Sequence, residues 1–473
     1  MRFGVYGLAI GAIVMQMAAA QAETFADALA SAYRNSNLLA QRQATLRAAD
    51  EDAAVAVARL RPVVQFITTA ASSYSNSIPS SRAGWGGSFS LTPQLQASMT
   101  LLDFGRGAKA VEIQKEVVLS TEASLTGVEQ TVLLSAAQAY VNVLLQQEMV
   151  GMQQSNVRVL TEELRAAKDR FDVGEVTRTD VSQAEAQLAA AKAQLAASEG
   201  QLALMREAYK ATVGHYPSNL APLPKAPQLP KSLVEAQSIA SRTHPDILAA
   251  QHQSRAADLG VEAARLEFMP TVKGTVGASV SRSYSDFGTN IDNSVNHFST
   301  GDNLFAQVQL TQTLYAGGQI SANYRKALNN QDAARAGLQQ TAVMAAQNVG
   351  NAWAQLSVAA ASIAAGDQQI AAAQAALDGV KEEAAVGSRT TLDVLNAEQA
   401  LLGARASRAQ ALANLYIGEY SLLATMGLMT AEHLRLGVPT YDPAAYYDAV
   451  KSAPATSVQG ARLDKILKLM GRD

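Results

Sequence analysis

The sequence contains no cysteine, which excludes both a disulfide framework and a lipid anchor attached through a cysteine thioether. It has only five histidines, and none lies three or four residues from another, so the pattern predicts no metal site. It also lacks a nucleophile elbow, a phosphate-binding loop and a zinc signature. These absences argue against an enzyme and predict a protein without a cofactor.

The chain also has little net charge and few long apolar runs. Its formal charge is −3 and it has no basic cluster, which argues against nucleic acid as a partner. The first 22 residues carry Arg2, an apolar run and the small-residue pattern Ala20-Gln21-Ala22, as in a secretory signal peptide cleaved after Ala22. No later run is long and apolar enough for a spanning helix. We therefore expect an exported chain that is periplasmic, secreted or a membrane β-barrel.

Proline is missing from two long stretches, 105–171 and 318–385, both rich in helix-favouring residues. At about 1.5 Å per residue, each stretch would form a helix of roughly 100 Å, too long for the core of a compact domain. Gly174 and Gly387 then end these helices, and a second helix of about 35 residues follows each glycine. The sequence thus predicts two long helical hairpins with tight tips.

The two hairpins belong to a duplicated unit of about 210 residues. Residues 173–181 align with 386–394, and the same spacing of 213 positions joins Gly214 to Gly427. This register is too long to be a solenoid repeat of 20–50 residues. The predicted organisation is a signal peptide (1–22), a first repeat (23–222), a proline-rich strap (223–231), a second repeat (232–430) and a carboxyl-terminal tail (431–473).

Each repeat also contains two segments whose apolar residues alternate with polar ones, as in β-strands. The predicted strands cover about 62–76, 89–103, 271–284 and 303–315. Strands of about 11 residues can cross a bilayer when tilted. Four strands cannot close a barrel, since single-chain barrels begin at about eight, so three copies would have to pool twelve. The alternative is a pair of amphipathic hairpins on a soluble sheet.

Three segments carry a resemblance to a known family. They are Leu101-Leu102-Asp103-Phe104-Gly105-Arg106, Leu314-Tyr315-Ala316-Gly317-Gly318-Gln319, and the second tip from Gly387 to Gln399. With the signal peptide and the two hairpins, the chain resembles the TolC family of outer-membrane efflux proteins. This resemblance implies a mixed α+β membrane protein, a homotrimer whose twelve-stranded β-barrel in the Gram-negative outer membrane continues as a periplasmic α-helical tunnel.

The resemblance also implies a function and partners. The protein would be an outer-membrane exit duct for small molecules or proteins, surrounded by outer-membrane lipid. A periplasmic adaptor and an inner-membrane transporter of the ABC or RND type would dock on it. The rival hypothesis is an exported coiled-coil structural protein with a soluble β head.

Residues of the tips acquire roles through the same resemblance. Asp393 matches the acid of a ring that narrows the periplasmic aperture, and Asn396 stands where a second acid can occur. Carboxylates crowded in a narrow pore attract cations. Arg389 matches a latch residue of the closed state, with Thr179 and Asp180 on the other hairpin as its expected partners.

A local structural role competes with these assignments. Thr177 and Thr390 can be helix N-caps, with Asp180 and Asp393 three residues on, near the positive end of the helix dipole. The two roles are compatible. The tip turns themselves are the expected contact for the adaptor, through Val173, Gly174, Val386 and Gly387.

The junctions between strands and helices complete the expected sites. Phe104 and Tyr315 could form an aromatic girdle at the membrane interface or pack over the junction between barrel and tunnel. Gly105, Gly317 and Gly318 would allow the chain to bend there.

Overall fold

The computed structural model describes residues 22–77, 84–225, 227–285 and 298–469, so the predicted signal peptide lies outside the described residues except for Ala22. The chain forms two compact units. We call them the hairpin unit (Met1–Leu39, Val128–Ala240 and Gln347–Thr440) and the sheet unit (Ala40–Gly127, Ser241–Ala346 and Tyr441–Asp473). The longest helices contribute residues to both units, and each unit is described by itself.

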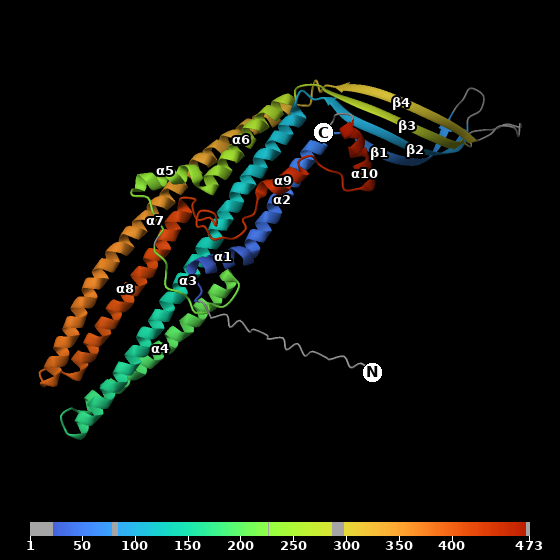
Figure 1. The fold of residues 1–473 in the computed structure, drawn as a ribbon. Coiled ribbons are helices and arrows are strands. Elements are labelled where there is room, and N and C mark those ends of the chain that lie inside the picture. The colour runs from blue at the N-terminus through green and yellow to red at the C-terminus, as the bar shows by residue number, and fades with distance from the viewer. Residues whose placement is uncertain (1–21, 78–83, 226, 286–297, 470–473) are drawn as a thin grey trace, which may run out of the picture. The chain divides into compact units, whose positions relative to one another are not determined.

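Helices make up most of the described part of the hairpin unit (Figure 1). Two helices of 67 residues each contribute their second parts, and each is followed after a short turn by a helix of 36 or 35 residues. The predicted helical hairpins are therefore confirmed. The elements are α1 (Phe25–Asn35), α3 (Arg106–Asp172) with α4 (Arg178–Val213), α5 (Leu233–Thr243), and α7 (Gln319–Ala385) with α8 (Thr391–Thr425).

The sheet unit contains one antiparallel sheet in the order β1-β2-β3-β4 (Figure 1). Pairing of β2 with β3 joins the strands of the two repeats into this single sheet, with one bulge between Thr100 and Leu102. Around the sheet strands, the unit contains α2 (Asn37–Ala58), β1 (Val63–Ser77), β2 (Gly84–Leu102), α6 (Pro245–Leu266), β3 (Thr271–Ser285), β4 (Phe298–Thr311), α9 (Pro443–Val450) and α10 (Val458–Leu469), with the first parts of α3 and α7.

β1 and β3 agree with their predicted bounds to within one residue, whereas β2 begins at Gly84 rather than at 89 and β4 occupies Phe298–Thr311 rather than 303–315. β2 begins at Gly84, because its glycines pair with β1 through backbone hydrogen bonds, including Gly86 with Ser75. The low strand propensity of glycine is thus overridden by the neighbouring strand. β4 ends at Thr311, so Tyr315 lies outside the strand in which it was predicted.

The helical segments before β1 and before β3 are each broken once. The segment from Phe25 is interrupted at Ser36, whose backbone is extended and whose hydroxyl accepts a hydrogen bond from the backbone NH of Leu39 at 3.2 Å. The segment from Leu233 is interrupted at His244, because Pro245 disfavours a helical conformation in the residue before it. Among the described residues, no helix is both long and apolar enough to cross a bilayer.

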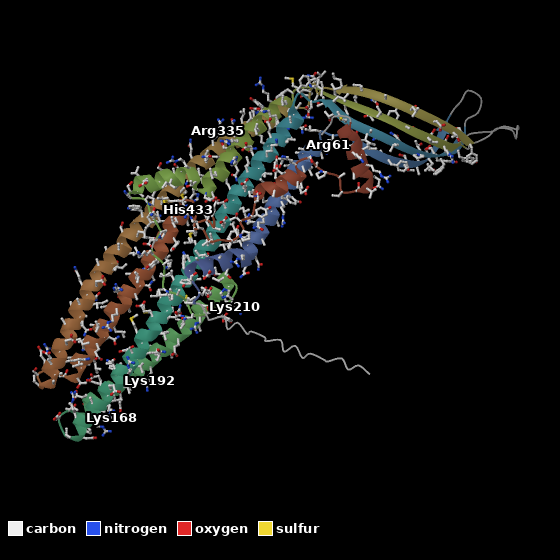
Figure 2. The ribbon with its side chains drawn as sticks, in the orientation of Figure 1. Arg61, Lys168, Lys192, Lys210, Arg335 and His433 are labelled. Atoms are coloured by element: carbon white, nitrogen blue, oxygen red, sulfur yellow. The ribbon has the colours of Figure 1, made fainter. Side chains whose placement is uncertain are left out.

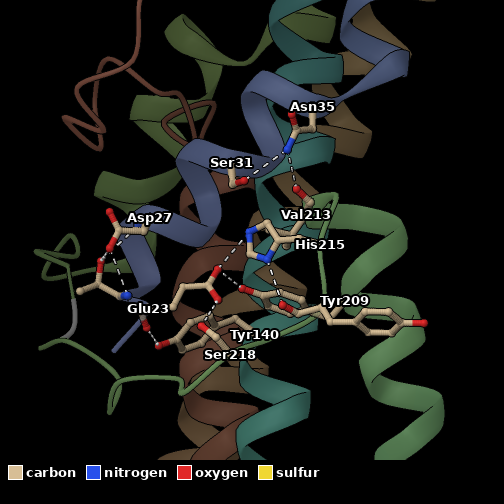
Figure 3. A network of polar contacts seen from close by, with 11 residues as sticks. Glu23, Asp27, Ser31, Asn35, Tyr140, Tyr209, Val213, His215 and Ser218 are labelled. Carbon is tan, nitrogen blue, oxygen red and sulfur yellow. Dashed lines mark hydrogen bonds and ion pairs between the residues drawn. The ribbon is translucent and has the colours of Figure 1, made fainter. Parts of the chain in front are cut away.

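The core of the hairpin unit is aromatic where α1 packs. The Phe25 ring meets those of Tyr140 and Tyr420 at centroid distances of 5.3 and 4.8 Å, and Tyr140 and Tyr209 are completely buried. Both tyrosine hydroxyls donate to Glu23: Tyr140 to its carbonyl oxygen at 3.0 Å and Tyr209 to its carboxylate at 2.6 Å (Figure 3). These bonds hold the segment before α1 against both helices of the first hairpin.

The sheet unit has its own core beneath the carboxyl-terminal tail. Leu46 and Val118 form a cluster with Tyr441 and Tyr447 packed against it. The Tyr446 hydroxyl on α9 donates to a carboxylate oxygen of α2 at 2.7 Å. The sequence predicted only a short helix at 461–470 in this tail; α10 occupies Val458–Leu469, and α9 was not predicted.

Candidate functional site: the two hairpin tips

Both tips turn through the same backbone geometry. The glycines Gly174 and Gly387 have φ angles of 81° and 79°, the left-handed region that glycine adopts without strain. In the first tip, the NH of Glu175 bonds to the carbonyl of Arg170 at 2.9 Å. The second tip repeats this bond from Ser388 to Glu383 at 3.0 Å, as in a Schellman motif.

The helix that leaves each tip begins with a capping box. The backbone NH of Thr177 donates to Asp180 Oδ2 at 2.9 Å, and the NH of Thr390 donates to Asp393 Oδ2 at 3.0 Å. Each threonine hydroxyl binds the same oxygen, at 2.7 and 2.9 Å. The structure thus confirms the capping role of both aspartates. Hydrogen bonds use only Oδ2 among the described residues, so the cap leaves Oδ1 of each carboxylate for another partner.

The caps also keep both carboxyls ionised. The Thr177 hydroxyl, followed by the Thr177 amide, lowers the pKa of Asp180 below its ordinary value. The Thr390 amide and then its hydroxyl lower the pKa of Asp393, and the charge of Arg389 acts in the same direction. Each cap therefore favours the ionised form of its aspartate.

The tips differ in one ion pair. Arg389 Nε lies 2.7 Å from Glu383 Oε2, and this contact raises the pKa of the arginine. The repeat-equivalent positions in the first tip are Arg170 and Val176, which cannot form such a pair. Within one chain, Arg389 contacts Glu383 rather than the predicted partners Thr179 and Asp180. The sequence-based prediction did not include Glu383. The two repeats differ at both position 383 and position 389, and this joint difference could have identified the pair.

The outer surface of each tip is apolar and exposed. The side chain of Val173 is 71% exposed and that of Val386 is 80% exposed. Asn396 is also exposed, one helical turn after Asp393. The two hairpins contact each other behind the tips, where Leu160 and Leu188 pack with Leu395 in one cluster.

The junctions lie in the sheet unit. Gly105, Gly317 and Gly318 all have positive φ angles, of 91°, 59° and 85°, so these glycines do carry the bend after each strand pair. Phe104 has a φ of 56°, an uncommon conformation for a bulky residue. Tyr315 is 88% exposed, which leaves its ring uncovered within one chain. Among the residues that the structure describes, no cluster of three metal-ligating side chains is found.

Comparisons with known proteins identify the family. A family model described as "Outer membrane efflux protein" matches residues 28–215 and 237–428. The chain is 34% identical over 433 residues to the outer membrane efflux protein BepC of Brucella suis, covering 92% of this chain and 91% of BepC. It is 25% identical to the outer membrane protein TolC of Escherichia coli, over 72% of this chain and 70% of TolC.

The fold also matches a solved channel. The open state of the Neisseria gonorrhoeae MtrE outer membrane channel superposes with a TM-score of 0.68 at 22% identity, covering 85% of this chain and 88% of MtrE. These matches reject the rival hypothesis of a coiled-coil protein with a soluble β head. The chain belongs to the outer membrane efflux protein family, and it is an outer-membrane exit duct with the trimeric barrel-and-tunnel fold of these channels.

Proposed function

We propose that the two tips of each copy form the periplasmic gate of a passive duct, with the second tip as its charged part. The observation that carries this proposal is the difference between two tips of equal backbone geometry. Only the second combines an ionised cap, Asp393, with the ion pair of Arg389 and Glu383. Capping needs no arginine before the threonine, because the first tip has the same cap with Val176 at that position.

In a trimer, Asp393 would contribute one carboxylate per copy to a ring around the aperture. Its Oδ1 is not used by the capping box, so the same residue can cap its helix and face the pore. Asn396 adds an uncharged amide rather than a second acid. The ring would attract cations but hold a divalent ion weakly.

Arg389 would act as the latch of the closed state. It would exchange Glu383 for Thr179 and Asp180 of another hairpin, using the Asp180 oxygen that its cap leaves available. Its exposed position supports such an exchange, since solvent screens a surface ion pair and makes it easy to break. Glu383 then competes with Thr179 and Asp180 for the side chain of Arg389.

The partners follow from the remaining surfaces. The exposed turns at Val173, Gly174, Val386 and Gly387 would contact a periplasmic adaptor, which connects the duct to an ABC or RND transporter of the inner membrane. The aromatic rings of Phe104 and Tyr315 would lie at the boundary of the outer-membrane lipid. The duct itself would catalyse no reaction and export what the transporter delivers.

Single-channel conductance of the purified trimer in a planar bilayer tests this gate. We expect Arg389→Ser to enlarge the closed-state current, because the latch is lost. Glu383→Gln is the matched variant: it removes the competitor of the latch, so the current should fall or stay at the wild-type level. Equal changes in both variants would contradict the latch, and a protein that needs no detergent and forms no channels would contradict the duct.

A further inference from the structure

A second feature of the hairpins is an ion pair that the duplication copied. Lys168 on α3 contacts Glu185 on α4 at 2.8 Å, near the first tip (Figure 2). Lys381 on α7 contacts Glu398 on α8, also at 2.8 Å. Lys381 and Glu398 lie 213 positions after Lys168 and Glu185. Each pair connects the two helices of its own hairpin.

The two copies differ in their surroundings. The side chain of Glu185 is 50% exposed, whereas that of Glu398 is 8% exposed. Lys381 occupies one oxygen of Glu398; the other, Oε2, is buried and receives no hydrogen bond from the described residues. Buried carboxylate oxygens in proteins nearly always have a donor, and the described residues provide none for this oxygen.

A pocket of about 570 Å³ lies beside this oxygen, within the size range of small-molecule sites. It is formed by α3, α7 and α8, and its walls include Met152, Leu377 and Leu401 as well as Glu398. The pocket is thus partly apolar, and its wall carries two carboxylates, Glu148 and Glu398, of which Glu398 has the buried oxygen without a donor among the described residues.

The charges around the pocket indicate the charge of the ligand that it would bind. The two cations in its wall already have partners, since Lys381 binds Glu398 and Arg405 donates to Gln374 at 3.1 Å. Burial, and then the charge of Glu398, raise the pKa of Glu163 on the neighbouring α3. A further anion would therefore be repelled, and a cationic donor would be attracted.

We propose that this pocket binds an organic cation, with an ammonium group on Glu398 Oε2 and an apolar body against Leu377 and Leu401. The site is separate from the gate at the tips. The first hairpin has no equivalent, because water reaches Glu185 and already satisfies its carboxylate.

Equilibrium dialysis of labelled 4-phenylbutylamine against the detergent-solubilised trimer tests the proposal. The uncharged analogue 4-phenylbutanol controls for partition into the micelle and for binding of the apolar body alone. We expect saturable binding of the amine at one site per chain, and weaker binding of the alcohol. Glu398→Gln should weaken amine binding roughly 10- to 100-fold, the loss of one charge-assisted hydrogen bond.

Two further variants keep the test decisive. Glu185→Gln changes the repeat-equivalent acid and should bind the amine like the wild type. Leu401→Trp retains the acid but fills the pocket, so binding of both compounds should fall. Equal amine binding by wild type and Glu398→Gln would overturn the proposal, as would the absence of saturable binding to the wild type. Neither result depends on channel conductance, so the gate is tested separately.

Discussion

The buried hydroxyl of Tyr209 offers a sharp test of how the segment before α1 is held. Its phenol donates to Glu23 Oε1 at 2.6 Å, and the tyrosine is completely buried (Figure 3). Ser218 and His215 lie farther from the same carboxylate, at 3.4 and 3.5 Å. Tyr209→Phe therefore removes the strongest donor to a carboxylate that water reaches poorly.

The expected cost follows from the hydrogen bond that is lost. A bond to a charged group contributes about 1.5–3 kcal/mol, and an unsatisfied buried acceptor keeps its desolvation penalty. Because 1.4 kcal/mol corresponds to a factor of about ten, local opening should become roughly 10- to 100-fold more frequent. Hydrogen exchange of the α1 amides measures this opening directly, without requiring the trimer to unfold in two states.

Tyr216→Phe is the matched control. The Tyr216 hydroxyl donates to Glu207 at 2.7 Å, nearly the same length, but the bond is exposed to solvent. Water can replace the hydroxyl there, so we expect a change within about 0.5 kcal/mol, or roughly twofold in exchange. If both variants accelerate α1 exchange equally, burial does not strengthen the Glu23 bond and the reasoning is wrong.

Three further outcomes follow from the described contacts. Asp393→Asn should reduce cation selectivity, measured as the reversal potential in a KCl gradient, because it removes one carboxylate per copy from the proposed ring; an unchanged reversal potential would contradict the ring. Burial, then two neighbouring glutamates, raise the pKa of Asp50, so its stabilising effect is complete below its ordinary pKa and lost as pH rises through the raised value. The protection factors of the α9 amides, which exclude the intrinsic base catalysis of exchange, should thus fall with rising pH in the wild type but stay level in Asp50→Asn, which should hold α9 better at neutral pH. Gly214→Ala should destabilise the hairpin unit by about 1–2 kcal/mol, because φ is 101° and a Cβ would lie 2.6 Å from a side-chain nitrogen of α1. Gly200→Ala, inside α4 with open space around it, should stabilise by about 0.5–1 kcal/mol; thermal denaturation of both variants checks the sign.

The hairpins and their tips could be predicted because their signals are local. A turn glycine followed by Thr-x-x-Asp specifies both the left-handed bend at Gly174 and the cap at Thr177, whatever packs nearby. The break at Pro245 was equally local, since proline restricts the residue before it. Where a prediction failed, as for the start of β2 at Gly84, the deciding contact came from another strand.

The packing of the tail and of the pocket beside Glu398 could not be predicted from the sequence, because both depend on contacts between distant parts of the chain. Tyr441 and Tyr447 look like ordinary residues of a polar tail, and only their contact with the cluster around Leu46 shows that α9 is docked. Similarly, the spacing of Lys381 and Glu398 predicts an ion pair as well as it does for the first hairpin. Which of the two pairs is buried depends on how one hairpin lies against the other.

Duplication explains why the functional differences are concentrated in so few positions. Both repeats must retain the glycine turn and the cap, because each hairpin needs them to reverse direction. Glu383 and Arg389 stand where the first repeat has Arg170 and Val176, and the fold of the first hairpin shows that the turn and cap do not need this pair. A substitution of one partner alone would leave an unpaired charge at the tip. We therefore expect the pair that differs between tips of equal backbone geometry to belong to the proposed gate rather than to the fold.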